Sequence, residues 1–327
     1  MLYLRKAEIK QCFSMKEAIE ASKKALSAYS KRLADVPLRT NLNIAQYEGQ
    51  SLYMPAYVSG DDSALGIKIV SVYPKNREKN LPSIFAVMLV LDPKTGIAKA
   101  YLDGTYFTQL RTGAVQGAAT DLLAKPRAKI GALIGTGGQA PAQLEAMLTV
   151  RKLKEVRIYS RDFDHVTKFC REQQSYYDCE LIPVKSSEAC VTGADIITTV
   201  TTAKEATFSA EWVKDGAHIN GIGSYTPEMC EIPQGLIRKA DLVLFDTMSG
   251  VLNEAGDFIT PLKKGAVLLH DYDGELGQLI NKQVKGRSSS KQITLFKSVG
   301  SAVLDVVVAN EIVKKAKKRG IGLELLD

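Results

Sequence analysis

The sequence of 327 residues predicts an α/β fold in two parts, a small α+β domain and a larger doubly wound parallel sheet. Before residue 125, strand-like segments lie close together between two helical stretches. From Lys129 onward, strand-like and helical segments alternate. An apolar strand at the start of this second part ends in a glycine turn, Gly135-Thr-Gly-Gly-Gln-Ala140, which a helix follows. These three observations assign the parallel sheet to the second part of the chain.

The first part contains a predicted helix at 15–33, where Ala18, Ile19, Ala25 and Leu26 belong to one apolar face. Its predicted strands are 38–44, 51–58, 64–73, 84–91 and 97–102. Because short turns such as Asp92-Pro-Lys-Thr-Gly96 join them, a mainly antiparallel sheet is expected. A second helix is predicted at 105–123 and ends at Lys125-Pro126.

The second part alternates between the two kinds of element, which favours a parallel sheet with helices on both faces. The predicted strands are 129–134, 155–160, 180–184, 194–200, 217–222, 241–246 and 266–269. The predicted helices are 140–150, 163–174 and 208–213. One long amphipathic helix is expected at 302–319, and it could return to the first domain.

The glycine turn has the order of a dinucleotide-binding fingerprint, strand, turn and helix. Gly135 permits the tight turn, Gly137 lets the backbone approach a pyrophosphate, and Ala140 allows close packing of helix and strand. The helix start offers unpaired N–H groups to phosphates. The first hypothesis is a nicotinamide or flavin dinucleotide site. The alternative is a glycine turn that holds no ligand.

The end of the second strand bears on the choice of cofactor. An acid there usually bonds the adenosine ribose, whereas this chain has Ser160 followed by Arg161. Because a guanidinium fork suits phosphate, NADP(H) is favoured, with NAD(H) as the alternative. The opposing interpretation is that Asp162 replaces the missing acid and Arg161 is merely solvated.

Two further strand ends are candidates for the nicotinamide side of the site. Thr199, Val200 and Thr201 end one strand, and Gly223 and Ser224 open the loop after another. Ligands of parallel sheets bind outside the carboxyl ends of the strands. The threonines could equally be present for β-propensity alone.

Composition excludes several classes of function. The hydrophobic share of 45% and charged share of 24% are ordinary for a globular enzyme, and no apolar run approaches the roughly 20 residues of a membrane span. The five cysteines have no CxxC spacing and the three histidines form no ligand cluster, so no metal is expected. Basic residues at 314–319 suit a solvated helix end, so nucleic-acid binding is not expected. The start of the chain has no leader pattern, so a cytoplasmic location is expected.

Several separate motifs together resemble one known family over essentially the whole chain. They are Pro37-Leu-Arg39-Thr, Leu65-Gly-Ile-Lys68-Ile-Val, Thr108-Gln-Leu-Arg111-Thr-Gly-Ala114, the glycine turn, Gly223-Ser-Tyr-Thr-Pro227 with Glu231, and Phe296-Lys-Ser-Val-Gly-Ser-Ala-Val-Leu-Asp305. Their order and spacing are similar to those of the ornithine cyclodeaminase/μ-crystallin family.

The resemblance implies a homodimer and a reaction. Residues 1–124, joined by a C-terminal helix at 302–327, would bind substrate and meet the partner's sheet. Residues 125–301 would form a Rossmann dinucleotide-binding domain. Members of the family share one step, in which hydride passes between a nicotinamide and the α-carbon of an amino or imino acid.

The resemblance also implies the site residues. Arg39, Lys68 and Arg111 would face the substrate, where guanidinium forks fix a carboxylate and Lys68 binds it or moves a proton. For each of them, the alternative is a surface or interface ion pair. The predicted cofactor-binding residues are Thr112, Gly135, Thr136, Gly137, Gly138, Gln139, Ser160, Arg161, Thr199, Val200, Thr201, Gly223 and Ser224.

One departure separates branches of the family. Ornithine cyclodeaminases carry an aspartate in the loop after strand 217–222, where this chain has Tyr225, also a predicted substrate contact. A phenol is a poor base at neutral pH, which weakens the cyclodeaminase reading. The favoured function is NAD(P)H-dependent reduction of a small α-imino acid such as Δ1-pyrroline-2-carboxylate, or the reverse dehydrogenation of an amino acid such as alanine. The alternatives are ornithine cyclodeamination and non-catalytic NADPH binding of the μ-crystallin type.

Overall fold

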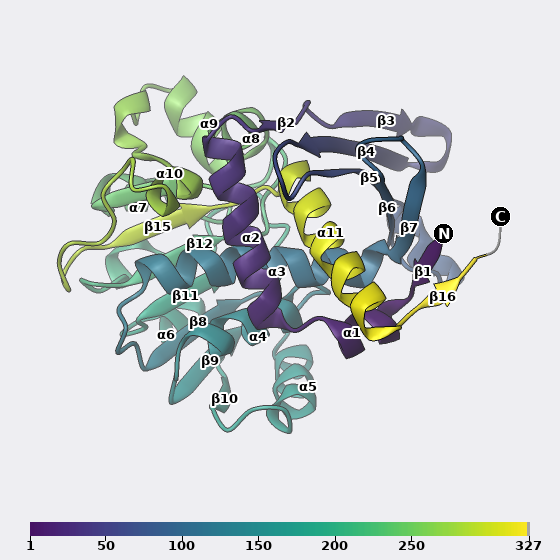
Figure 1. Cartoon of the computed structure of the whole chain (residues 1–327). Coiled ribbons are helices and arrows are strands. Elements are labelled where there is room, and N and C mark those ends of the chain that lie inside the picture. Colours follow the sequence, from purple (N-terminus) through teal and green to yellow (C-terminus); the bar gives the residue numbers. More distant parts are fainter. Residues whose placement is uncertain (326–327) are drawn as a thin grey trace. The chain divides into compact units, whose positions relative to one another are not determined.

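The computed structural model describes residues 1–325, and the chain divides into two compact units (Figure 1). Unit 1 comprises Met1–Arg111 and Ser301–Asp327, and unit 2 comprises Thr112–Gly300. The division falls inside helix α3 (Gly104–Leu123), whereas the boundary expected from the sequence lies just after this helix.

Unit 1 contains an eight-stranded sheet in the order β16-β1-β7-β6-β5-β4-β2, with β3 paired to β4. The strands are β1 (Leu2–Leu4), β2 (Ala34–Asp35), β3 (Thr40–Ile44), β4 (Gly49–Val58), β5 (Ala64–Val72), β6 (Ile84–Leu91), β7 (Ala98–Asp103) and β16 (Leu323–Glu324). Strands β4 to β7 pair antiparallel, and β1 joins β7 in parallel. The sheet is therefore mainly antiparallel, as its closely spaced strands predict.

Helices cover one face of this sheet. They are α1 (Lys6–Cys12), α2 (Met15–Ser30) and α11 (Ala302–Arg319), and α11 packs on α2 and on β4, β5 and β6. Ser14 and Glu17 form a capping box that fixes the start of α2, and Gly320 ends α11 at a φ of 62°. The helix predicted at 302–327 therefore stops earlier and gives way to β16, and residues 326–327 lie outside the described residues.

Unit 2 contains a second eight-stranded sheet, in the order β10-β9-β8-β11-β12-β15-β13-β14. Its strands are β8 (Ile130–Ile134), β9 (Glu155–Tyr159), β10 (Glu180–Pro183), β11 (Ile196–Thr199), β12 (His218–Gly221), β13 (Leu242–Phe245), β14 (Gly274–Glu275) and β15 (Thr294–Lys297). All of these pairings are parallel. Strand order reverses between β8 and β11, which is the switch point where open α/β sheets bind ligands.

The helices of unit 2 connect these strands. They are the second half of α3, α4 (Ala140–Val150), α5 (Phe163–Gln174), α6 (Ser187–Val191), α7 (Gln234–Lys239), α8 (Met248–Glu254), α9 (Gly256–Lys263) and α10 (Leu276–Ile280). Short 3-10 turns are η1 (Ala45–Tyr47), η2 (Pro74–Lys79), η3 (Ala210–Trp212) and η4 (Leu269–Asp271). The predicted fold class, a Rossmann-type sheet plus a smaller α+β unit, is confirmed.

Two predicted elements of unit 2 are wrong. The strand predicted at 266–269 is a turn running into η4, because the Asp271 carboxylate accepts the Leu268 N–H at 2.7 Å and closes a 3-10 turn. Strand β15, which pairs with β12 and β13, was not predicted. The helix predicted at 208–213 is the 3-10 turn η3, capped by Ser209. Short apolar runs carry too little periodicity to separate these outcomes.

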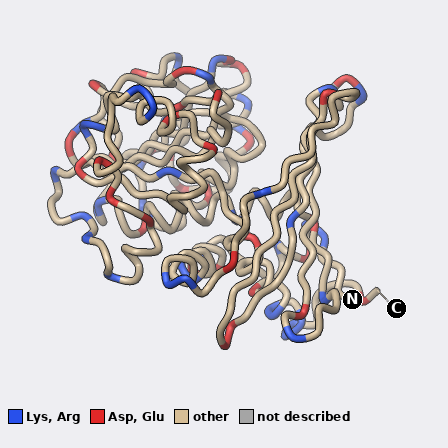
Figure 2. Tube along the Cα trace, turned by 90° about the horizontal axis from the view of Figure 1, so that it is seen from above, with Lys and Arg blue, Asp and Glu red and all other residues tan. Residues whose placement is uncertain are grey.

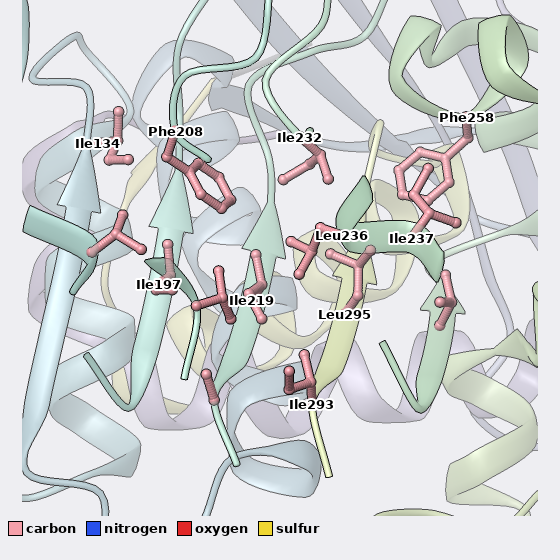
Figure 3. Packing of buried hydrophobic residues seen from close by; sticks show 14 of the residues in the cluster. Ile134, Ile197, Phe208, Ile219, Ile232, Leu236, Ile237, Phe258, Ile293 and Leu295 are labelled. Carbon is pink, nitrogen blue, oxygen red and sulfur yellow. The ribbon is translucent and has the colours of Figure 1, made fainter. Parts of the chain in front are cut away.

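The core of unit 2 explains why the parallel strands are so apolar. Ile134, Ile197, Ile219 and Leu295 come from four neighbouring strands and point to the same face of the sheet (Figure 3). Phe208, Ile232, Leu236, Ile237 and Phe258 cover them from loops and helices. Burial of each such side chain stabilises the folded state by about 1.5–3 kcal/mol. The core therefore holds the carboxyl edge of the sheet in place.

Charge is distributed over both units. Basic and acidic residues both occur on the outer loops of each unit (Figure 2). Within residues 1–325, no helix is long and apolar enough to cross a membrane. The same residues contain no group of His, Cys, Asp and Glu that could hold a metal ion.

Candidate active site

Lys68 is the most unusual side chain of unit 1, because it is 1% exposed in the middle of a sheet. The alternation of β5 turns it toward the helix-covered face, between Met54 of β4 and Met88 of β6. Its Nζ lies 2.9 Å from Oδ1 and 2.8 Å from Oδ2 of Asp305, in the first turn of α11. A lysine in these apolar surroundings requires such an anion.

Arg111 approaches the same carboxylate from α3. Its Nε lies 2.9 Å from Oδ1 of Asp305, near enough for an ion pair but without hydrogen-bond alignment. Its Nη1 is buried and has no hydrogen-bond partner within residues 1–325. Since a buried N–H left unpaired is costly, this guanidinium is suited to an anionic ligand.

Arg39 belongs to the same cluster through its charge. It lies in the loop before β3 and is half-buried. Burial, followed by the charges of Arg111 and Arg39, lowers the pKa of Lys68 to about 7 against the opposing effect of Asp305. The structure thus brings Arg39, Lys68 and Arg111 together and adds Asp305, so the cluster can bind a carboxylate beside a lysine that titrates near neutrality.

The glycine turn of unit 2 has the geometry that a pyrophosphate needs. Gly135 has a φ of 106°, and a Cβ there would lie 2.6 Å from the Val200 carbonyl oxygen. Gly137 is exposed, and a Cβ there would meet nothing within 4 Å, so the backbone faces open space. Gln139 gives α4 no side-chain cap, and Pro141 lies in its first turn. These residues fit a dinucleotide held at the start of α4.

The end of β9 lies against this turn. Thr136 Oγ1 donates to Ser160 Oγ at 3.3 Å and lies 3.1 Å from His165 Nδ1. The Asp162 carboxylate accepts the His165 N–H at 3.0 Å as the cap of α5. Asp162 is therefore engaged as a cap, while Arg161 is exposed.

Glu231 joins the loops after β11 and β12. Its fully buried carboxylate accepts the N–H of Thr201 at 2.5 Å, of Gly223 at 2.6 Å and of Ser224 at 2.9 Å. A Cβ at Gly223 would lie 2.2 Å from the backbone of Thr201, so only glycine allows this approach. The predicted residues Thr201, Gly223 and Ser224 are thus fixed to one another.

The buried ion pair of Lys297 and Asp257 holds the loop after β12. Lys297 Nζ donates to Ser224 Oγ at 2.5 Å and lies 3.2 Å from Asp257 Oδ2. Ser224 Oγ donates to the same carboxylate, whose other oxygen accepts the N–H of Glu231 at 2.5 Å. The loop after β12 is therefore held by one lysine and two carboxylates.

The remaining predicted residues lie at strand ends, in loops and on α3. Thr199 ends β11 and is buried, and Val200 N donates to the Ile134 carbonyl at 2.8 Å. Tyr225 is half-buried, and its ring packs against the core of unit 2. Gly138 is exposed, and Thr112 is half-buried on α3.

Sequence reasoning missed the roles of four charged residues, which are Asp305, Glu231, Asp257 and Lys297. All four are buried. A signal exists for two of them, because Asp305 interrupts the run Ala302-Val-Leu-Asp-Val-Val-Val308 and Lys297 interrupts an apolar strand. A charge inside an apolar run indicates a buried ion pair, but it does not name the partner.

Known proteins share this architecture. The model of the ornithine cyclodeaminase/mu-crystallin family matches residues 1–320. A Δ1-pyrroline-2-carboxylate reductase of Bacillus cereus is 36% identical over 322 residues, covering 98% of each chain. The structure of the Thermococcus litoralis Δ1-pyrroline-2-carboxylate reductase, in complex with NADH and L-proline, has a TM-score of 0.94 and 38% identity over 99% of this chain and all of its own. An archaeal alanine dehydrogenase dimer with bound NAD has a TM-score of 0.91 and 31% identity over 100% of this chain and 99% of its own. The protein described here is a member of the ornithine cyclodeaminase/mu-crystallin family.

Proposed function

We propose that this protein is a nicotinamide-dependent oxidoreductase that reduces a small cyclic α-imino acid, with Δ1-pyrroline-2-carboxylate as the leading substrate. The observation that carries the proposal is the buried Nη1 of Arg111, which has no hydrogen-bond partner within residues 1–325 and lies in the same cluster as Lys68. Lys68 and Arg111 both pair with the single carboxylate of Asp305, and the charge of Arg39 acts on the same lysine. The cluster retains positive charge for a substrate carboxylate.

Each residue of the cluster has a task in this reaction. Arg111 and Arg39 hold the substrate carboxylate and so orient the imine carbon. Lys68, in its ammonium form, donates a proton or a hydrogen bond to the imine nitrogen as that nitrogen gains electron density. Burial keeps water away from the ammonium group and strengthens its contacts.

Unit 2 would hold the cofactor. Gly135, Thr136, Gly137, Gly138 and Gln139 would bind the pyrophosphate at the start of α4. Ser160 and Arg161 would meet the adenosine ribose. Thr112, Thr199, Val200, Thr201, Gly223 and Ser224 would complete the cofactor site, and Tyr225 would contact the substrate. When bound, the nicotinamide supplies the hydride that the imine carbon accepts.

The names of the relatives support the same chemistry. The Thermococcus litoralis enzyme binds L-proline, which is Δ1-pyrroline-2-carboxylate plus two hydrogen atoms. The archaeal alanine dehydrogenase acts on an open-chain amino acid and is less similar to this chain. A cyclic imino acid is therefore the first substrate to test, and pyruvate with ammonia is the second.

A substrate panel tests the proposal. The purified protein is supplied with NADPH or NADH and with Δ1-pyrroline-2-carboxylate, its six-membered homologue, or pyruvate with ammonia, and cofactor absorbance is followed. Oxidation that depends on a cyclic imino acid is expected. Ornithine with NAD+, assayed for proline and ammonia, tests cyclodeamination. Cofactor binding without turnover of any of these compounds would contradict the proposal and favour a binding protein.

Arg161 is expected to select NADPH. Because Asp162 caps α5 and Ser160 is uncharged, the end of β9 offers a 2′-phosphate an exposed guanidinium and a hydroxyl. Arg161→Ala should lower the NADPH-to-NADH ratio of kcat/KM by about tenfold or more, the effect of one charge-assisted contact. Arg171→Ala, an exposed arginine in the last turn of the same helix, is the control. An unchanged ratio would remove Arg161 from cofactor selection.

The helix-free face of the unit 1 sheet is expected to form a homodimer. Side chains there form apolar rows across β4, β5 and β6, which are Tyr53–Ile69–Val87, Pro55–Ile67–Leu89 and Tyr57–Leu65–Leu91. They are partly exposed, and an apolar patch of this extent usually marks an interface.

Leu89→Arg should convert the dimer to a monomer, because a charge at the centre of an apolar interface is costly. Sedimentation velocity measures this change. Ile97→Arg, at a 67% exposed residue beside β7, should leave the dimer intact. A wild-type monomer at micromolar concentration would contradict the assignment.

A further inference from the structure

We propose that Asp305 is a positioning residue that keeps the Lys68 side chain charged and aimed at the substrate, and thereby sets the pH range in which the enzyme works. This inference rests on the proposed function, because it assigns the ammonium form of Lys68 a task in imine reduction. Asp305 is not a surface carboxylate, because its side chain is 0% exposed. The residues on both sides of it in α11 are apolar and buried.

The geometry supports an orienting contact. Both carboxylate oxygens lie within 2.9 Å of Lys68 Nζ, so the ammonium is approached from one defined direction. Oδ1 is shared with Arg111 Nε at 2.9 Å, which links the proton-bearing group to the carboxylate-binding group. One side chain of α11 therefore fixes two side chains from β5 and α3 relative to each other.

The charged groups that act on Lys68 come from α3, α11 and the loop before β3. Arg111 of α3 and Arg39 of the loop before β3 disfavour the ammonium, and Asp305 of α11 favours it. The neighbouring strands contribute Met54 and Met88, which carry no charge. Burial and the two arginines lower the pKa of Lys68 to about 7, even though Asp305 opposes this shift. Without Asp305, none of these groups opposes the lowering of the Lys68 pKa.

A lower pKa of Lys68 narrows the pH range of activity from the alkaline side. A lysine with a lowered pKa is charged below that pKa and neutral above it, so activity that needs the ammonium falls as pH rises. Removal of an opposing carboxylate at contact distance lowers the pKa further, by about 1 to 3 pH units. The descending limb of the kcat/KM profile, which reports the free enzyme, should then move toward acid. Ionisation of the substrate itself is common to all variants and cannot produce a difference between them.

Packing alone does not require this carboxylate. Helix α11 buries an extended apolar face against α2 and the sheet, and Asp305 offsets the charge of Lys68 there, so its removal is also expected to lower stability. A purely structural Asp305 would affect stability or the amount of active enzyme. It would not shift the pH dependence of the molecules that remain folded.

The test compares kcat/KM for Δ1-pyrroline-2-carboxylate across pH 5 to 10 in the full-length wild type, Asp305→Asn and Asp62→Asn. Asp62 is the matched control, because it pairs with Lys314 of the same helix at 2.9 Å but its side chain is 73% exposed. The descending limb should move by about one pH unit or more toward acid in Asp305→Asn and stay in place in Asp62→Asn. Asp305→Glu, which retains the charge, should restore the limb to within a few tenths of its wild-type position.

Each result of these variants either supports or overturns the positioning role of Asp305. A limb that does not move in Asp305→Asn overturns the proposal, as does an equal shift in Asp62→Asn. If Asp305→Asn does not fold, Asp305→Ser has the same expected shift, and failure of both to fold would assign Asp305 to structure and overturn the positioning role. A wild type that reduces no imino acid refutes the proposed function instead, and that result is visible before any variant is made.

Discussion

Replacement of Lys68 by methionine is expected to lower kcat/KM for the imino acid by about 10²- to 10⁴-fold, the range of a single acid–base group. The physical reason is that Nζ is the buried, titratable donor of the cluster, and no other side chain of β5 can replace it. Methionine matches the length of the lysine and suits the position between Met54 and Met88, so the sheet should remain folded. Asp305 retains its ion pair with Arg111.

Steady-state kinetics with a fixed, saturating cofactor measures this loss, and circular dichroism and the thermal midpoint verify the fold. Lys99→Met is the matched control, since Lys99 lies on β7 of the same sheet, is partly exposed and pairs loosely with Asp92 at 3.6 Å. It should change kcat/KM less than twofold. If Lys68→Met kept near-normal turnover, Lys68 would have no role in proton transfer, and burial of the lysine would need a structural explanation.

Replacement of Arg111 by methionine should weaken binding of the carboxylate. A charge-assisted contact contributes about 1.5–3 kcal/mol, and its loss should raise KM for the imino acid by about 10- to 100-fold. Arg111→Lys should recover only part of this loss, because an ammonium group cannot form the two parallel hydrogen bonds of a guanidinium fork. KM for NADPH should change little in comparison, because Arg111 belongs to unit 1 and its ion pair is with Asp305.

Inhibition by acetate or pyrrole-2-carboxylate provides a second measurement, because both are carboxylates that cannot be reduced. Their inhibition constants should rise in parallel with KM in the methionine variant. Arg5→Met is the control, since Arg5 pairs with Glu8 on the surface of the same unit. An unchanged KM for the imino acid together with a lowered kcat would contradict a binding role for Arg111.

Much of the fold follows from local pattern. The glycine turn, the alternation after Lys129 and the long helix at 302–319 predict elements that the structure has at nearly the same residues. Strand β15 could not be found this way, because Thr294–Lys297 is short and buried on both faces and therefore has no alternation. The apolar run at 266–269 is equally short and forms a turn instead. The difference depends on which run finds hydrogen-bonding neighbours in the sheet.

The site divides in the same way. Chain-local chemistry identifies the phosphate-binding glycines, because φ and backbone access are properties of single residues. Lys68 and Arg111 are indicated only by the resemblance to the family, because a local pattern cannot distinguish them from surface or interface ion pairs. Local pattern does not reveal the carboxylates of Glu231 and Asp305. Glu231 joins two loops, and Asp305 lies between Lys68 and Arg111. These carboxylates lie up to 237 residues from their partners along the chain.

The sequence by itself therefore determined the fold class, the family and the residue types that can bind a dinucleotide and a carboxylate. Only the tertiary structure decided which charges meet. It paired Lys68 with Asp305, left Arg111 Nη1 without a partner within residues 1–325 and lowered the pKa of the lysine to about 7. Ion pairing and desolvation depend on distance in space and on exclusion of water, and neither quantity is encoded in the spacing of residues along the chain.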